Sequence, residues 1–168
     1  ARREKLGNPN FDLILVSPLV RTHETAAILA GTDLPGLYSR RLMVVPELHI
    51  EYLREAPDTE AHPSLQEMFR RLGHAPLRTY LEQDEEKTEL LIDYFGCNGW
   101  EELTRILSGR DVTNTLVVGH AVLLPAIIYT GALESITKKL LGFPFEECQG
   151  VQLELDNSES VTKLTLLD

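Results

Sequence analysis

Short apolar runs alternate with amphipathic segments along the chain. Three runs rich in branched side chains have the length of buried parallel strands: Leu13–Val16, Leu42–Val45 and Leu116–Val118. Apolar residues also recur at helical spacing, over residues 19–30, 65–72, 100–107 and 121–129. This alternation predicts an α/β fold, with a mainly parallel sheet and helices on both of its faces.

Turn residues predict where several of these elements end. Gly96 closes the amphipathic segment before it, and Asn98-Gly99 predicts a turn ahead of the next helix. Near the end of the chain we expect a short helix and then a hairpin at or near the sheet edge. These elements are residues 135–141 for the helix, and 151–155 and 161–166 for the two strands of the hairpin.

Composition limits the class of protein. The 168 residues predict one domain over 1–168, and a net charge of -10 argues against general nucleic-acid binding without excluding a phosphate substrate. Neither a run long enough to cross a membrane nor a signal peptide is visible. Cys97 and Cys148 form neither a disulfide framework nor a metal motif. We therefore expect free thiols and a cytoplasmic location.

The first strand leads into a candidate anion site. Ser17 follows the strand as a predicted N-cap, Pro18 suits the first helical position, and Gly31 ends the helix. Arg21 then lies in the first helical turn, just past the carboxyl end of a strand, where ligands bind in open α/β sheets. Free backbone N–H groups and a guanidinium can hold an anion there. The alternative is an ordinary surface arginine.

A second strand end strengthens the anion interpretation. Gly119 allows a close turn after the strand at 116–118, and His120 follows at its carboxyl end. An arginine and a histidine at the same sheet edge favour a phosphate site. We expect the side-chain ends of Arg21 and His120 to lie within about 10 Å of each other, so that one phosphate can reach both.

Three segments resemble the histidine phosphatase superfamily, which includes the cofactor-dependent phosphoglycerate mutases and the phosphohistidine phosphatases. Residues 17–26, SPLVRTHETA, resemble its S-P-L-x-R-(T/A)-x-x-T-A segment, and residues 117–120, VVGH, resemble its V-V-G-H segment. Glu47, within VPEL, is similar to the acidic residue between them. The resemblance spans residues 11–130 and implies the phosphoglycerate mutase-like version of the fold.

One motif of the superfamily does not occur in this chain. The superfamily opens with a strand ending in Arg-His-Gly, whose histidine accepts the phosphoryl group. None of the five histidines here lies in such a motif. We therefore expect the first strand and its catalytic loop to precede Ala1 in the parent protein, and the 168-residue chain alone to be inactive. The other explanation is a pseudoenzyme.

The resemblance also implies roles for the site residues. It implies phosphoryl transfer from a small phosphomonoester or a phosphohistidine to water, through a phosphohistidine intermediate. Arg21 would hold phosphoryl oxygens, His120 would bind and stabilise the phosphoryl group, and Glu47 would donate a proton. Ser17 and Thr22 complete the predicted substrate-binding set. No cofactor and no metal is implied, and the expected partner is a small phosphorylated substrate or a phosphoprotein.

Several alternatives stay open at this stage. The chain could be an inactive phosphate- or protein-binding pseudoenzyme, or part of a mutase whose substrate accepts the phosphate again. A nucleotide-binding domain ranks last, because neither glycine-rich phosphate motif occurs. Glu47 could instead be a solvated loop residue. His49 and Glu51 lie close to it in the sequence, so the group that acts is undecided, although His49 lacks the partners of a metal ligand.

Overall fold

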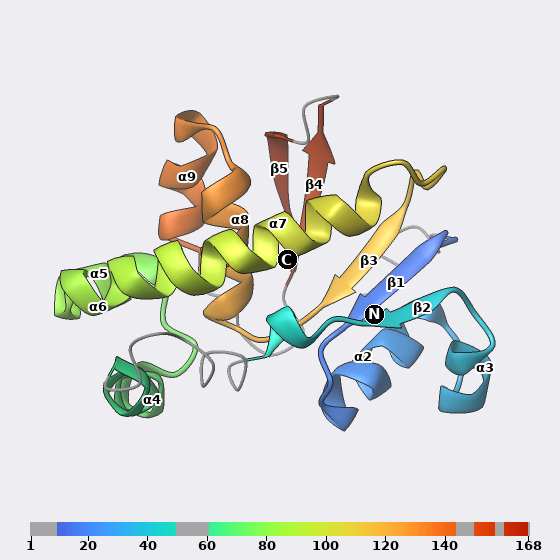
Figure 1. The fold of residues 1–168 in the computed structure, drawn as a ribbon, viewed down its shortest axis with the longest axis horizontal. Coiled ribbons are helices and arrows are strands. Elements are labelled where there is room, and N and C mark those ends of the chain that lie inside the picture. Colours follow the sequence, from blue (N-terminus) through green and yellow to red (C-terminus); the bar gives the residue numbers. More distant parts are fainter. Residues whose placement is uncertain (1–9, 50–60, 144–149, 157–159, 168) are drawn as a thin grey trace.

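A parallel sheet forms the centre of the molecule (Figure 1). The computed structural model describes residues 10–49, 61–143, 150–156 and 160–167. Within these residues, β1 (Leu13–Val16), β2 (Leu42–Val44) and β3 (Thr115–Val118) pair in the order β2-β1-β3, all parallel. The predicted α/β fold is confirmed, and each of the three predicted strands is found to within one residue.

Helices cover both faces of this sheet. Along β1, Leu13 and Leu15 pack into a large core with α7 (Cys97–Leu107) and α8 (Leu123–Gly131). Ile14 and Val16 point the other way, into a smaller core with α2 (Val20–Ala30). Figure 1 shows α2 and α7 on opposite sides of the sheet. This two-sided burial follows from the period of two along a strand.

The other described helical elements surround this centre. They are α3 (Leu34–Tyr38), η1 (Pro46–Leu48), α4 (Ala61–Leu72), α5 (Leu77–Gln83), α6 (Glu85–Leu90), η3 (Leu91–Gly96) and α9 (Glu134–Leu141). The helices predicted over 65–72 and 135–141 are therefore present. In the described part of the chain, no helix is both long and apolar enough to span a membrane.

The start of α2 differs from the prediction. The helix begins at Val20 with Leu19 as its N-cap, so Ser17 is not the N-cap and Pro18 is not the first helical residue. Ser17 is fully buried, and its hydroxyl contacts a residue far away in the sequence. Gly31 ends the helix as predicted, in the left-handed region at φ 68°.

The predicted break at residues 96–99 is wrong. Helical structure continues from α6 through the π-helical segment η3 into α7. A Cβ on Gly96 would lie 2.7 Å from the Ala126 carbonyl oxygen, and one on Gly99 would lie 2.6 Å from the Ile127 side chain. These glycines therefore allow α8 to pack closely against η3 and α7, and the packing outweighs their low helix propensity.

The C-terminal hairpin is present but forms its own sheet. β4 (Gly150–Leu155) and β5 (Val161–Leu167) pair antiparallel, in a two-stranded sheet separate from β1–β3. It was expected at or near the edge of the parallel sheet. A cavity lies between β3 and β4 instead, so the hairpin is not hydrogen-bonded to that edge.

Candidate functional site

Three predicted site residues meet where β1 and β3 end. Arg21 Nη2 lies 3.2 Å from His120 Nδ1, and Ser17 Oγ lies 2.9 Å from His120 Nε2. Ser17 follows β1 directly, Arg21 belongs to the first turn of α2, and His120 follows β3. The distance between Arg21 and His120 is well inside the limit that we expected, so one phosphate could contact both side chains.

The hydrogen bonds define the state of His120. A guanidinium can only donate, so Nδ1 accepts from Arg21 and the proton of the neutral ring is on Nε2, which donates to Ser17 Oγ. Burial, the positive charge of Arg21 and the neighbouring His49 lower the pKa of His120 to about 4. His120 is therefore neutral at pH 7 in this structure.

Hydrogen bonds to the backbone of Ser17 fix its position. Its N–H donates to the Val118 carbonyl at 3.0 Å, which ties it to β3. Its own carbonyl accepts from Thr22 Oγ1 at 2.8 Å and from His23 Nε2 at 3.1 Å. His23 Nδ1 lies 3.1 Å from the Tyr38 hydroxyl and forms a hydrogen bond with it. These bonds fix the position from which the Ser17 hydroxyl contacts His120.

This arrangement bears on two residues of the predicted motif. The Thr22 hydroxyl is directed to the carbonyls of Ser17 and Leu19, so in this structure it supports the turn. Its predicted contact with substrate stays a prediction. His23 is buried and is bonded to the Ser17 carbonyl, whereas His120 is bonded to the Ser17 hydroxyl. The motif alone did not indicate this supporting role, because it depends on Tyr38 of α3.

Glu47 lies in η1, and no described contact joins it to Arg21 or His120. Its Oε2 is buried, with no hydrogen-bond partner among the described residues. The negative charge of Glu47 acts on Arg105 of α7. The pKa of Arg105 is raised chiefly by the hydrogen bond of Arg105 to Glu102 and in smaller part by Glu47. The proton-donor role of Glu47 stays a prediction.

His49 is the residue that the sequence left undecided and that the structure brings to the site. It follows η1, and the residue is 8% exposed. The ring centroid lies 5.4 Å from that of His120 in an edge-to-face arrangement. Glu51, the other neighbour considered, lies outside the described residues. The only sequence signal for His49 was its place in the loop of Glu47.

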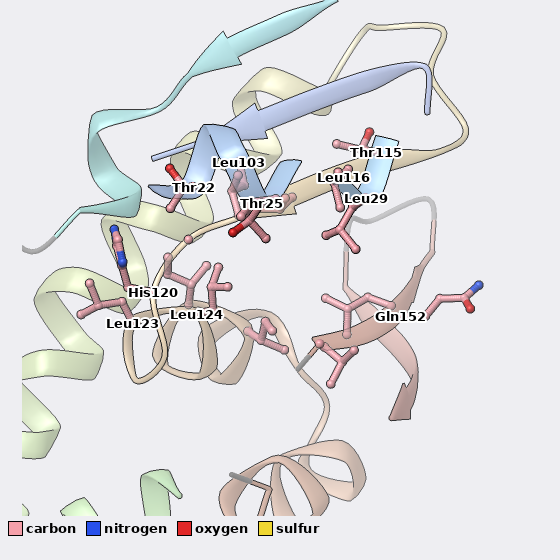
Figure 2. Close-up of a pocket in the computed structure, with 18 of the residues that line it drawn as sticks. Thr22, Thr25, Leu29, Leu103, Thr115, Leu116, His120, Leu123, Leu124 and Gln152 are labelled. Carbon is pink, nitrogen blue, oxygen red and sulfur yellow. The ribbon is translucent and has the colours of Figure 1, made fainter. Parts of the chain in front are cut away.

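A cavity of about 1620 Å³ opens from this cluster. Arg21, His49 and His120 line it, and it continues between β3 and β4. Figure 2 shows His120 at one end of the cavity and Gln152 of β4 toward the other, with Leu116 of β3 across from β4. The cluster therefore presents a cation and imidazoles to an open space, which is an arrangement suited to binding an anion.

Comparison with protein families gave a match over nearly the whole chain. The model of the histidine phosphatase superfamily (branch 1) matches residues 1–166. A search of curated proteins gave no match.

Proposed function

The chain belongs to the histidine phosphatase superfamily, and we propose that it forms the phosphate-binding part of a phosphatase for small phosphomonoesters or phosphohistidine. Membership itself indicates phosphoryl transfer. The observation that carries the proposal is the contact of Arg21 with His120 at the ends of two parallel strands. This edge of an α/β sheet is where such folds bind their ligands.

An incoming phosphate would change the bonding within this cluster. The Arg21 guanidinium is exposed and can grip two phosphoryl oxygens at once. When it does so, its bond to His120 Nδ1 is replaced by phosphate, and the negative charge raises the pKa of His120. A protonated His120 then donates from Nδ1 to the phosphoryl group, while its Nε2 stays bonded to Ser17. Binding and charge stabilisation are thus coupled.

The proposal needs a nucleophile that these residues do not supply. In this mechanism a histidine attacks the phosphorus, the P–O bond to the leaving group breaks, and water later hydrolyses the P–N bond. We assign the nucleophile to the expected strand that ends in Arg-His-Gly. The cavity between β3 and β4 supports this assignment, because it leaves space for a strand beside β3 and is also lined by His120.

The hydrogen-bonding groups of β3 also support an additional strand. The Val118 carbonyl accepts from Ser17, so the backbone groups of Val118 and Leu116 face β1. In a parallel pair those of the alternate residues, Thr115 and Val117, face the opposite side, which is the cavity. An edge of this kind is a template for another strand.

Side chains around the cavity have the matching character. Ile28 of α2 lines the cavity and is 70% exposed. Leu116, Val151 and Leu153 also line it and are only half-buried. A strand with apolar side chains on both faces would cover these residues, and its carboxyl end would reach the Arg21–His120 pair if it ran parallel to β3.

The test compares this chain with a form extended upstream through Arg-His-Gly, assayed with an aryl phosphate. We expect turnover only in the extended form, and we expect Arg21→Lys to weaken orthovanadate binding, since an ammonium cannot reproduce the two-pronged grip. Silence in both forms with vanadate binding intact would favour the pseudoenzyme. Transfer of the phosphate back to a substrate would indicate a mutase.

Two proline variants of the extended form test the strand itself. Val117→Pro removes an N–H that faces the cavity. Val44→Pro is the matched control, because Val45 donates to the Val16 carbonyl and Val44 therefore faces away from β1 at the opposite edge. We expect Val117→Pro to reduce turnover much more than Val44→Pro. Equal effects would contradict a strand paired with β3.

A further inference from the structure

A series of hydrogen bonds connects α3 with His120. Tyr38 is bonded to His23, and His23 is bonded to the carbonyl of Ser17. The Ser17 hydroxyl is in turn bonded to His120. We propose that His23 and Tyr38 are positioning residues for anion binding, because they hold the Ser17 hydroxyl where it orients the imidazole ring of the site. This inference rests on the proposed function, since it concerns the same site, and it extends that site to α3.

The orientation of the His120 ring depends on Ser17. The described hydrogen bonds of this ring join Nδ1 to Arg21 and Nε2 to the Ser17 hydroxyl. Arg21 is exposed and, in the proposed function, is bonded to phosphate when phosphate is present. The bond from Nε2 to Ser17 then orients the ring from the protein side. The direction in which Nδ1 points is therefore set by the position of the Ser17 hydroxyl.

The carbonyl of Ser17 needs His23 as well as Thr22. Ser17 is 0% exposed, so a lost partner of its carbonyl is not replaced by bulk water. Thr22 Oγ1 lies 2.8 Å from this carbonyl oxygen and 2.6 Å from that of Leu19, and it has one proton for both. His23 Nε2 donates a second N–H to the Ser17 carbonyl, at 3.1 Å. Loss of His23 would therefore leave this buried carbonyl with a shared donor, and Ser17 could shift.

Tyr38 fixes the orientation of the His23 ring. Its hydroxyl lies 3.1 Å from His23 Nδ1, and the two ring centroids are 5.8 Å apart. Because both ring nitrogens are bonded, a half turn of the imidazole would break two hydrogen bonds at once. Tyr38 ends α3 and is 57% exposed, so this support comes from the surface of the molecule. A residue outside the motifs that indicated the site thus contributes to its geometry.

The first test follows the Nε2 proton of His120 by NMR in the 168-residue chain without phosphate. We expect a slowly exchanging ¹H resonance, because this N–H is bonded to a buried hydroxyl. His23→Phe keeps an aromatic ring but removes both bonds, and should raise the exchange rate about tenfold. His23→Gln keeps an N–H donor for the Ser17 carbonyl and should preserve the resonance. Tyr38→Phe removes one hydroxyl from an exposed side chain, so it leaves the fold intact, and should raise the exchange rate about threefold.

Tyr80→Phe is the matched control for Tyr38→Phe. The Tyr80 hydroxyl also has a hydrogen bond, which it donates to the Gly73 carbonyl at 2.7 Å. Its removal should lower the free energy of unfolding, as the loss of any such bond does. No described hydrogen bond joins Tyr80 to the cluster around His120, so the His120 resonance should stay unchanged. This control separates a general loss of stability from a positioning role.

The second test measures the dissociation constant of inorganic phosphate from the ring shifts of His120 during a titration. We expect His23→Phe to weaken binding about tenfold and Tyr38→Phe about threefold, the range for one lost hydrogen bond. His23→Gln and Tyr80→Phe should stay within about twofold of the original chain. Arg21→Lys, which changes the anion-binding fork itself, should weaken binding whether or not His23 has a positioning role.

Each outcome separates this inference from the proposed function. If Arg21→Lys weakens phosphate binding and His23→Phe changes neither binding nor the His120 resonance, the phosphate site stands and the inference is wrong. If His23→Phe and His23→Gln have equal effects, the ring acts only through packing, and the inference is also wrong. Equal effects of Tyr38→Phe and Tyr80→Phe on the resonance would overturn the role of Tyr38. If Arg21→Lys leaves binding unchanged, the proposed function fails, and the resonance of the phosphate-free chain still decides the positioning role.

Discussion

β1 and β3 are similar in sequence but differ in burial. β1 reads LILV and is buried at every position, whereas β3 reads TLVV and is buried only at Val118. β1 has a strand on both sides, and β3 has β1 on one side and the cavity on the other. An apolar strand is thus fully buried only when neighbours cover both of its edges. The open edge of β3 is where this fold has room for another element.

The largest expected effect tests the comparison through two matched leucines. Leu15 of β1 is 0% exposed, and Leu15→Ala should lower the free energy of unfolding by about 2–5 kcal/mol. Leu116 of β3 is half-buried, and Leu116→Ala should cost about 1 kcal/mol, in proportion to its smaller buried area. Urea unfolding of both variants measures the difference. Equal losses would mean that β3 is covered as completely as β1.

His120, which follows β3, should make the free energy of unfolding depend on pH. The pKa of His120 falls from 6.5 to about 4 on folding, so between these values the unfolded chain binds more protons. Stability from this group is complete above pH 6.5 and is lost as the pH falls towards 4. His120→Gln should remove this part of the pH dependence of unfolding. The control is His74→Gln, at an exposed histidine between α4 and α5, which should leave the pH dependence unchanged.

An NMR titration of His120 measures its pKa directly and can contradict this prediction. Its imidazole ¹H and ¹⁵N shifts should show a midpoint near pH 4 in the folded chain. A midpoint near 6.5 would mean that neither burial nor Arg21 acts on this ring in solution.

The smallest expected effect concerns the wall of the cavity. Ile28 is 70% exposed, so Ile28→Ala should change the free energy of unfolding of this chain by less than about 0.5 kcal/mol. Ile127→Ala, at a residue that is 0% exposed, is the matched control and should cost about 2–5 kcal/mol. In the extended form, Ile28→Ala should become measurably destabilising. An unchanged small effect there would argue against a strand over Ile28.

Local pattern was enough to predict the strands and the two ends of the site. Apolar runs bounded by turn residues located β1, β2 and β3, because a buried strand needs apolar residues at nearly every position. The order of strand and helix then implied that Arg21 and His120 share one sheet edge. Their 3.2 Å separation agrees with that expectation, since parallel strands end at the same side.

Contacts between distant segments decided what the pattern missed. Gly96 and Gly99 suggest a break by themselves, but the close approach of α8 makes them helical. Ser17 is a good N-cap by residue type, yet its hydroxyl is bonded to His120, 103 residues later in the chain. In both places a long-range contact outweighed a local preference that amounts to about 1 kcal/mol.

The sequence by itself determined the fold class, the parallel strands and the pairing of an arginine with a histidine at one sheet edge. Only the tertiary structure decided the neutral state of His120, the support of Ser17 by His23 and the approach of His49. It also separated the hairpin from β3 and left a cavity between them. The reason is physical: residue periodicity reports which face of an element is buried, whereas the neighbour across that face is chosen by packing of the whole chain.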